Sequence, residues 1–226
     1  LKVIELSPGN FDELVLYAEL LGAANWFINV YLNDNGVLPE TASWSSNIAS
    51  FHGQLSTGDL NQDGWVDVVV SRYIGDASFE SPGGVDIYLN DNGQLPGAPS
   101  QVVEGYFSFS NALGDVDLDG DLDLALAVGE GYYNGPMSSV VLENIDGWFA
   151  SPMWVDQVQG TAYDVEFIDA DNDKDLDLIV LDSGAPHRVV ENVGGQLAAA
   201  SWLLGDDANA GNSITLVDLD GDELLD

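Results

Sequence analysis

The stretch at 58–70, GDLNQDGWVDVVV, carries oxygen-bearing side chains at every second position and then turns apolar. Such a stretch can be a calcium loop of the EF-hand kind, a catalytic carboxylate cluster or a structural turn. An EF-hand requires a glutamate at the twelfth position of its loop and a helix on each side. Counted from Asp59, the twelfth position is Val70, which is typical of a buried strand. A dockerin loop, which is also helical, fails for the same reason, so the stretch predicts an acidic loop between two strands.

The acidic stretch returns three more times along the chain. It reads GDVDLDGDLDLALAV at 114–128, IDADNDKDLDLIVL at 168–181 and VDLDGDELLD at 217–226. Intervals of 49 to 56 residues separate the leading aspartates, which are Asp59, Asp115, Asp169 and Asp218. This regular return weakens the hypothesis of a single catalytic cluster and favours a repeat architecture.

A second motif recurs in the same rhythm. It is YLNDNGVLP at 31–39 and YLNDNGQLP at 88–96, with weaker copies LENIDGWF at 142–149 and VENVGGQL at 190–197. Glycine after asparagine or aspartate, flanked by apolar residues, indicates a tight hairpin turn. The asparagines that open these turns are Asn33, Asn90, Asn144 and Asn192.

Short runs of branched apolar residues lie between the two motifs, and no segment has a convincing helical period with caps. Each repeat offers about four strands, of which the strand before the acidic loop is expected to be innermost. A period near 50 residues with four strands is typical of a propeller blade. We therefore predict an all-β fold, a β-propeller of four-stranded blades, with four blades and the first strand of a fifth. The approximate repeats of this single domain or fragment, 1–226, are 1–49, 50–105, 106–160, 161–211 and the partial repeat 212–226.

The spacing within the acidic stretch suits a hard divalent cation. Side-chain oxygens at positions 1, 3 and 5 project to one side of a tight turn, position 7 adds a backbone carbonyl, and position 9 closes the shell. Oxygen ligands in this number are typical of Ca²⁺, at roughly 2.3–2.6 Å. The four predicted ligand sets are Asp59, Asn61, Asp63, Trp65 and Asp67; Asp115, Asp117, Asp119, Asp121 and Asp123; Asp169, Asp171, Asp173, Asp175 and Asp177; and Asp218, Asp220, Asp222, Leu224 and Asp226.

Position 6 of each loop is expected to need a positive φ angle, which glycine adopts most readily. Gly64 and Gly120 meet this requirement, whereas Lys174 and Glu223 do not. Lys174 also brings a positive charge close to the ion. We therefore expect the third loop to bind calcium more weakly than the second. In the first repeat the corresponding stretch, 3–14, has lost its ligand residues, and no site is predicted there.

The stretch SFHGQLSTGDLNQDGWVDVVV at 50–70 resembles the FG-GAP repeat of integrin α-subunit propellers. The VCBS repeats of bacterial and marine proteins are equally similar, and the LNDNG turns match their LNN-G-G element. The resemblance covers nearly the whole chain and implies the propeller fold, the calcium loops and usually seven blades. Because the chain stops at Asp226, the last ligand position of a loop, a fragment and a propeller completed by other material both remain open.

In integrins the metal loops lie on one face of the propeller and ligands meet the opposite face, so the resemblance also implies a ligand-binding region. Here the opposite face would be built by the loops 72–84, 129–139 and 182–188. Aromatic side chains at loop tips suit sugar stacking or a protein contact. The candidate ligand-binding residues, for which ordinary loop packing is the alternative, are Arg72, Tyr73, Phe79, Tyr132, Tyr133, His187 and Arg188.

The composition limits the possible partners. The chain has 39 acidic residues against 4 lysines and arginines, a net charge of −35, and no cysteine. Binding of a nucleic-acid backbone needs basic clusters and is excluded. No apolar run of about 18 residues is present, so no membrane span is expected. The excess acidity fits solubility in salty water, cation binding or a cationic partner.

Three functions fit these observations. The first is a calcium-stabilised module, extracellular or at the cell surface, that binds a protein or a glycan in adhesion. The second is a structural subunit of an extracellular assembly or filament, held together by self-association. The third is the propeller of a polysaccharide-active enzyme. Only His52 and His187 are present and no catalytic motif is found, so we expect no enzyme activity of the chain itself.

Overall fold

The computed structural model describes residues 2–5, 13–18, 27–34, 37–75, 80–129, 135–199, 202–204 and 213–218. The chain divides into two compact units. The first unit comprises 1–108 together with 145–148, and the second comprises 109–144 together with 149–226. All regular elements of the described residues are β-strands, and none is a helix.

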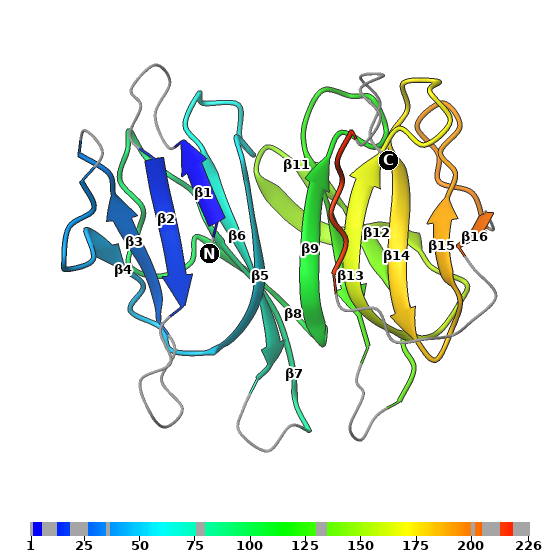
Figure 1. The fold of residues 1–226 in the computed structure, drawn as a ribbon, viewed down its shortest axis with the longest axis horizontal. Helices are drawn as coiled ribbons and strands as arrows, with labels where there is room; N and C mark the ends of the chain where they lie inside the picture. The colour runs from blue at the N-terminus through cyan, green and yellow to red at the C-terminus, as the bar shows by residue number, and fades with distance from the viewer. Residues whose placement is uncertain are drawn as a thin grey trace. The chain divides into compact units, whose positions relative to one another are not determined.

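The first unit contains two four-stranded sheets, each in sequential strand order. One has the order β1-β2-β3-β4 and the other β5-β6-β7-β8, and their neighbouring strands are antiparallel. Figure 1 shows the first sheet in dark to lighter blue and the second in cyan to green. Their strands are β1 (Lys2–Glu5), β2 (Glu13–Ala18), β3 (Ile28–Leu32), β4 (Trp44–Ser45), β5 (Phe51–Gly58), β6 (Asp67–Ile74), β7 (Pro82–Tyr88) and β8 (Gln101–Glu104).

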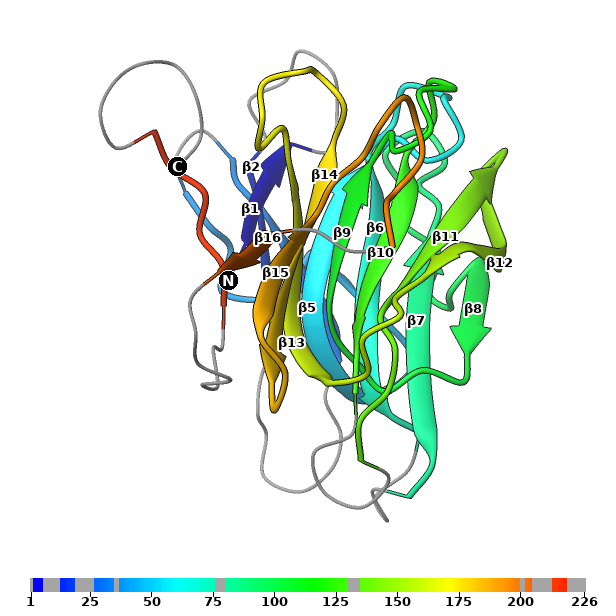
Figure 2. The same cartoon turned by 90° about the vertical axis from the view of Figure 1, so that its right-hand side faces the viewer.

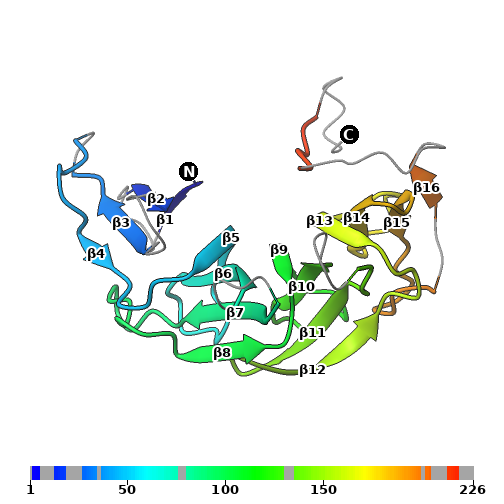
Figure 3. The same ribbon diagram turned by 90° about the horizontal axis from the view of Figure 1, so that it is seen from below.

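The second unit holds two further four-stranded sheets, in the orders β12-β11-β10-β9 and β13-β14-β15-β16. Each begins at one edge with the strand that precedes an acidic loop. Figures 2 and 3 show the successive strands of each sheet from the side and from below. The strands are β9 (Ser108–Gly114), β10 (Asp123–Val128), β11 (Val140–Ile145), β12 (Trp148–Val155), β13 (Thr161–Ile168), β14 (Asp177–Ser183), β15 (His187–Val190) and β16 (Trp202–Leu204).

Each unit has its own hydrophobic core, built from the apolar runs that follow the acidic loops. In the first unit Val68 and Val70 of β6 pack with Ile28 and Val30 of β3 and with Tyr88. In the second unit the core joins β10 to the β13–β14 hairpin. Its buried residues are Ala112, Val116, Ala125, Ala127, Val141, Ala162, Val165, Leu178, Val180 and Val190. Burial of branched side chains at this density holds the strands that carry the loops.

These sheets confirm an all-β fold for the described residues, in four-stranded antiparallel sheets of the kind that form propeller blades. Closure into a propeller stays a prediction, as do the repeat boundaries. The stretch 213–218, expected to begin a fifth blade, is described but forms no regular strand. Its Ile214 and Leu216 pack against Ile168, Ile179 and Val189 of the preceding sheet.

Candidate metal centre

The first three acidic loops connect the first and second strands of their sheets. The first loop (59–67) joins β5 to β6, the second loop (115–123) joins β9 to β10, and the third loop (169–177) joins β13 to β14. Each is a strand–loop–strand turn, as the apolar twelfth positions predict. The fourth loop (218–226) lies outside the described residues except for Asp218.

Backbone N–H groups fold each loop around its own acidic side chains. In the first loop Asp59 accepts hydrogen bonds from the N–H groups of Asp63 and Gly64, at 3.0 and 2.8 Å. Asp63 accepts one from Trp65 at 2.9 Å. The third loop repeats the pattern, with Asp169 accepting from the fifth and sixth residues at 3.0 Å each. These bonds turn the side chains of positions 1 and 5 toward the inside of the loop.

Two positions of each loop adopt the left-handed backbone conformation. Position 6 does so as predicted, at φ +88° for Gly64 and +98° for Gly120, and Lys174 takes the same conformation at +81° although it is not a glycine. Position 4 also has a positive φ, which the sequence did not lead us to expect. It is occupied by Gln62, Leu118 and Asn172. A Leu in this region is strained, because its Cβ approaches the backbone.

Position 9 is a buried junction that the sequence analysis only partly anticipated. Asp67 is fully buried. One of its carboxylate oxygens accepts the N–H of Leu60 at 2.8 Å, and the other accepts the N–H of Asn90 at 2.7 Å. Asp123 and Asp177 make the same two bonds, to the second residue of their loop and to the hairpin asparagine. Each oxygen retains a second lone pair for a cation.

The hairpin asparagine completes this junction. The side-chain amide of Asn90 donates to the carbonyl of Val66, the eighth position of the first loop, at 3.0 Å. Asn144 donates to Leu122 at 3.0 Å in the same way, and Asn192 donates to the eighth position of the third loop at 3.1 Å. The acidic loop and the asparagine turn keep one period because they are hydrogen-bonded to each other. Sequence analysis identified the asparagines as turn residues and missed this role.

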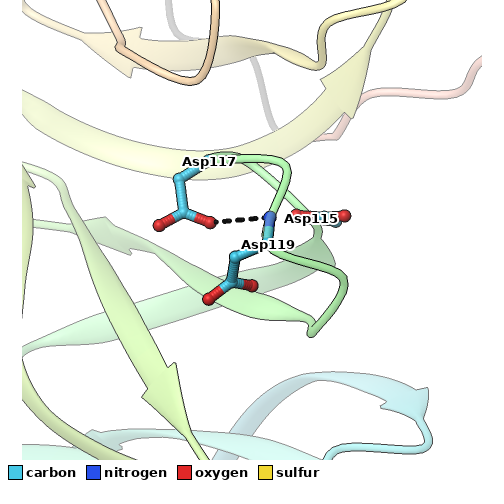
Figure 4. Close-up of side chains that lie close together, drawn as sticks. All are labelled: Asp115, Asp117 and Asp119. Carbon is cyan, nitrogen blue, oxygen red and sulfur yellow. Dashed lines mark hydrogen bonds between the residues drawn. The ribbon is translucent and has the colours of Figure 1, made fainter.

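The carboxylates of positions 1, 3 and 5 gather closely in two loops. Asp115, Asp117 and Asp119 each offer an oxygen within 4.8 Å of the others, and the same holds for the first three aspartates of the third loop. Figure 4 shows the second-loop group, with Asp117 accepting the Asp119 N–H at 3.2 Å. Asp115 Oδ1 and Asp121 Oδ1 are buried and have no hydrogen-bond partner among the described residues. Unpartnered carboxylate oxygens beside those of neighbouring aspartates fit a hard divalent cation.

Burial and mutual repulsion act on the pKa values of these groups. Desolvation, with a smaller contribution from neighbouring aspartates, raises the pKa of Asp67, Asp121 and Asp123 to about 6. The same causes raise the pKa of Asp117 and Asp171 above the ordinary aspartate value. A bound cation would reverse this effect, because it stabilises the charged form.

The described candidates for ligand binding differ in how deeply they are buried and in what they contact. Tyr73 is buried, with its ring 6.0 Å from that of Phe107. Arg72 is half-buried and lies 3.6 Å from the buried carboxylate of Asp86. The Nδ1 atom of His187 accepts the Asp182 N–H at 3.2 Å. Phe79, Tyr132 and Tyr133 lie outside the described residues.

Arg188 is also an interior residue, only 5% exposed. It forms ion pairs with Asp156 and Asp182, both of which are buried, and donates a further hydrogen bond to the carbonyl of Pro186 at 3.1 Å. Burial raises the pKa of Asp182, while the guanidinium opposes this shift. Tyr73 lies in β6 and Arg188 in β15, so both are packed within their sheets and not in the loops predicted for them. Ligand binding by either residue stays a prediction.

A hollow of about 520 Å³ lies beside the second loop, within the second unit. It is lined by Val116 and Asp117 of that loop, by Met153 and Trp154, and by residues 194–197 of the asparagine turn. The indole N–H of Trp154 donates to the carbonyl of Ala198 at 3.2 Å. Nothing in the spacing of the sequence places these segments together.

Two human proteins are similar to part of this chain. Integrin alpha-7 is 33% identical over an alignment of 145 residues that covers 57% of this chain and 12% of that protein. Integrin alpha-6 is 28% identical over an alignment of 138 residues that covers 56% of this chain and 12% of that protein. The chain thus spans 12% of the length of these curated relatives, and no family model matches it. The weak and partial similarity points to the same family as the acidic repeats.

Proposed function

We propose that this chain is an extracellular binding module of the adhesion type, stabilised by calcium, that recognises a protein or a glycan. The observation that carries the proposal is the acidic loop built in the same way three times, with its ninth residue joined to the asparagine turn. Similarity to two integrin alpha chains supports the adhesion class and the location outside cells or at their surface. Within the described residues, no helix has the length and apolar character to span a membrane.

Calcium would be held in each loop by the oxygens of positions 1, 3, 5 and 9 and by the carbonyl of position 7. Up to four ions are proposed, of which the fourth would use Asp218, Asp220, Asp222, Leu224 and Asp226. The ion would supply charge neutralisation to carboxylates that repel one another and would fix the turn between two strands. Its proposed role is structural, and it makes the loop end of each sheet rigid.

The ligand is proposed to meet the loops at the other end of the strands. Of the candidates described there, Arg72 and His187 remain half-buried. Arg188 and Tyr73 would act there only by holding the loops in place. Phe79, Tyr132 and Tyr133 remain proposals for aromatic contacts with a sugar or a protein side chain.

Thermal unfolding with and without calcium tests the metal part of this proposal. Each ion at about 100 times its dissociation constant should add about 2.7 kcal/mol to the free energy of unfolding, so the melting temperature should rise clearly. A variant with Asp63→Asn, Asp119→Asn and Asp173→Asn should lose most of this rise. Glu143→Gln, an exposed acidic residue outside the loops, is the matched control and should keep it. An equal rise in the triple variant and the control contradicts the proposed sites.

Binding of immobilised glycans and extracellular proteins tests the functional part. Calcium-dependent binding that the triple loop variant loses is the expected result. Turnover of a polysaccharide by the isolated chain would favour the enzyme alternative. Concentration-dependent polymers in electron micrographs, without binding to any glycan or protein, would favour the structural subunit.

A further inference from the structure

The asparagine turn at 192–195 contacts two acidic loops at once, both within the second unit. On the side of the third loop it makes three hydrogen bonds. The N–H of Asn192 donates to Asp177 at 2.7 Å, its side-chain amide donates to the carbonyl of Leu176 at 3.1 Å, and the N–H of Gly194 donates to Asp175 at 2.5 Å. Positions 7, 8 and 9 of the third loop are therefore all held by this turn.

The same turn holds the second loop from the other side. The side-chain amide of Asn192 also donates to the carbonyl of Val116, at 2.8 Å. Gly195 lies so close that a Cβ built on it would come within 2.7 Å of the carbonyl oxygen of Asp117. Val116 lies between the first two proposed ligands of the second loop, and Asp117 is one of them. Any displacement of the turn thus moves the backbone from which these ligands project.

We propose that Asn192 couples the calcium affinities of the second and third loops, so that filling one loop strengthens binding in the other. This inference rests on the proposed calcium binding. Asn192 acts as a positioning residue: it touches no ion, and its two N–H bonds go to one carbonyl in each loop. A cation in the third loop fixes positions 7 and 9, which fixes the turn and, through it, positions 2 and 3 of the second loop.

Positive coupling follows from the ordering that the two loops share. The first ion orders the turn, and the second ion binds to a loop whose backbone is already held on that side. Water cannot easily replace the bonds of Asn192, because the residue is only 1% exposed. Asn90 provides the contrast: its side-chain amide donates to the carbonyl of Val66, within its own repeat.

Site-resolved calcium titration by NMR spectroscopy tests the coupling on the full chain. The amide of Gly120 donates to Asp115 and that of Lys174 donates to Asp169, so each reports the state of its own loop. The calcium affinity of the third loop is measured with the second loop intact and with it disabled by Asp119→Asn. We expect disabling the second loop to weaken the third by about fivefold or more, the usual lower range of coupling between sites.

The same pair of titrations in an Asn192→Ala background should show a much smaller ratio between the two affinities of the third loop. Asn192→Ala by itself should leave both loops able to bind calcium. Asn90→Ala removes the equivalent bond in the first unit and should leave the ratio unchanged. If Asn192→Ala does not fold, Gly195→Ala is used, because its Cβ separates the turn from Asp117 while leaving the Asn192 side chain in place.

The outcomes separate this inference from the proposed function. If neither reporter amide responds to calcium, calcium binding itself is wrong. If both respond but Asp119→Asn leaves the calcium affinity of the third loop unchanged, the loops bind calcium independently and the proposed coupling is wrong. If the ratio survives in Asn192→Ala, or in Gly195→Ala where that variant replaces it, the coupling does not pass through this turn, and the proposed role of Asn192 is overturned.

Discussion

Strand β14 carries a buried aspartate near each end, and the two carboxylates have different partners. At its start, Asp177 belongs to the third loop, where further aspartates crowd together at positions 1, 3 and 5. Near its other end, Asp182 is paired with Arg188, which also binds Asp156. Both carboxylates are fully or nearly fully buried. Among the described residues, a cationic side chain pairs with the second carboxylate and none with the first.

This difference separates a buried charge that a side chain of the protein opposes from one that, in the proposed function, an added cation would oppose. The guanidinium of Arg188 is shared by two buried carboxylates, so it compensates half of their negative charge within the fold. Among the described residues, the charge of the loop is opposed by backbone N–H groups and by the exposed Lys174. If calcium binds as proposed, the cation would add the missing positive charge, and the loop end would be sensitive to calcium while the Arg188 end would not.

Replacing Arg188 with leucine should cause the largest loss of stability. The change leaves Asp156 and Asp182 buried without a counter-charge, and breaking a buried ion pair in this way costs about 3–5 kcal/mol. Urea unfolding in saturating calcium measures the loss. Arg188→Lys keeps the positive charge but loses the two guanidinium nitrogens that contact the two carboxylates. Its loss of stability should lie between that of the unaltered chain and that of the leucine variant. A loss below about 1 kcal/mol in the leucine variant would contradict the claim that Asp156 and Asp182 depend on Arg188 as their counter-charge.

Lowering the pH should raise the metal-free stability that the loop carboxylates contribute and weaken their calcium affinity, with an effect of intermediate size. Without calcium, Asp67, Asp121 and Asp123 have pKa values of about 6 rather than the usual 3.8, so the folded chain binds more protons than the unfolded chain in this window. Their contribution to the metal-free stability therefore rises as the pH falls from 7 to 5. Calcium needs the charged carboxylates, so its affinity should fall by about tenfold per pH unit below 6 for each proton displaced.

The measurement is the melting temperature of dialysed protein with and without calcium across this pH range. The difference between the two curves should be largest above pH 6 and should shrink toward pH 5. In an Arg188→Lys variant the difference should follow the same course, because the ion pair lies away from the loops. A difference that stays constant from pH 7 to 5 would show that these carboxylates hold no ion.

The acidic loops could be predicted from the sequence because their information is local. Spacing of Asp59, Asn61 and Asp63 specifies which oxygens share one side of a turn, and Val70 specifies the strand that follows. The antiparallel order of the strands also follows from local turns, which connect each strand to the next. Position 4 was missed, because Gln62 and Leu118 are of types that rarely take a positive φ, and Asn172 alone is of a type that does so readily.

Contacts between residues far apart in the sequence could not be predicted from local patterns. Asn192 meets Val116 across 76 residues of sequence, and Arg188 meets Asp156 across 32. Neither spacing recurs as a pattern, and only the packing of strands brings the partners together. The aromatic and basic residues near the end of β6 and in β15 suggested a ligand face, yet Tyr73 and Arg188 are buried. Position along a strand, rather than residue type, decided their surroundings.

The smallest predicted effect concerns Lys174, the basic residue that the third loop does have. Its φ of +81° costs a side-chain-bearing residue up to about 1 kcal/mol, so Lys174→Gly should stabilise the metal-free chain by that amount or less. Both Lys174→Gly and Lys174→Gln remove a positive charge beside the ion and should tighten calcium binding in the third loop. Only the glycine variant should also gain stability without calcium. If both variants bind calcium as the unaltered chain does, the exposed ammonium is too well screened by water to weaken the loop, and the second and third loops are equivalent.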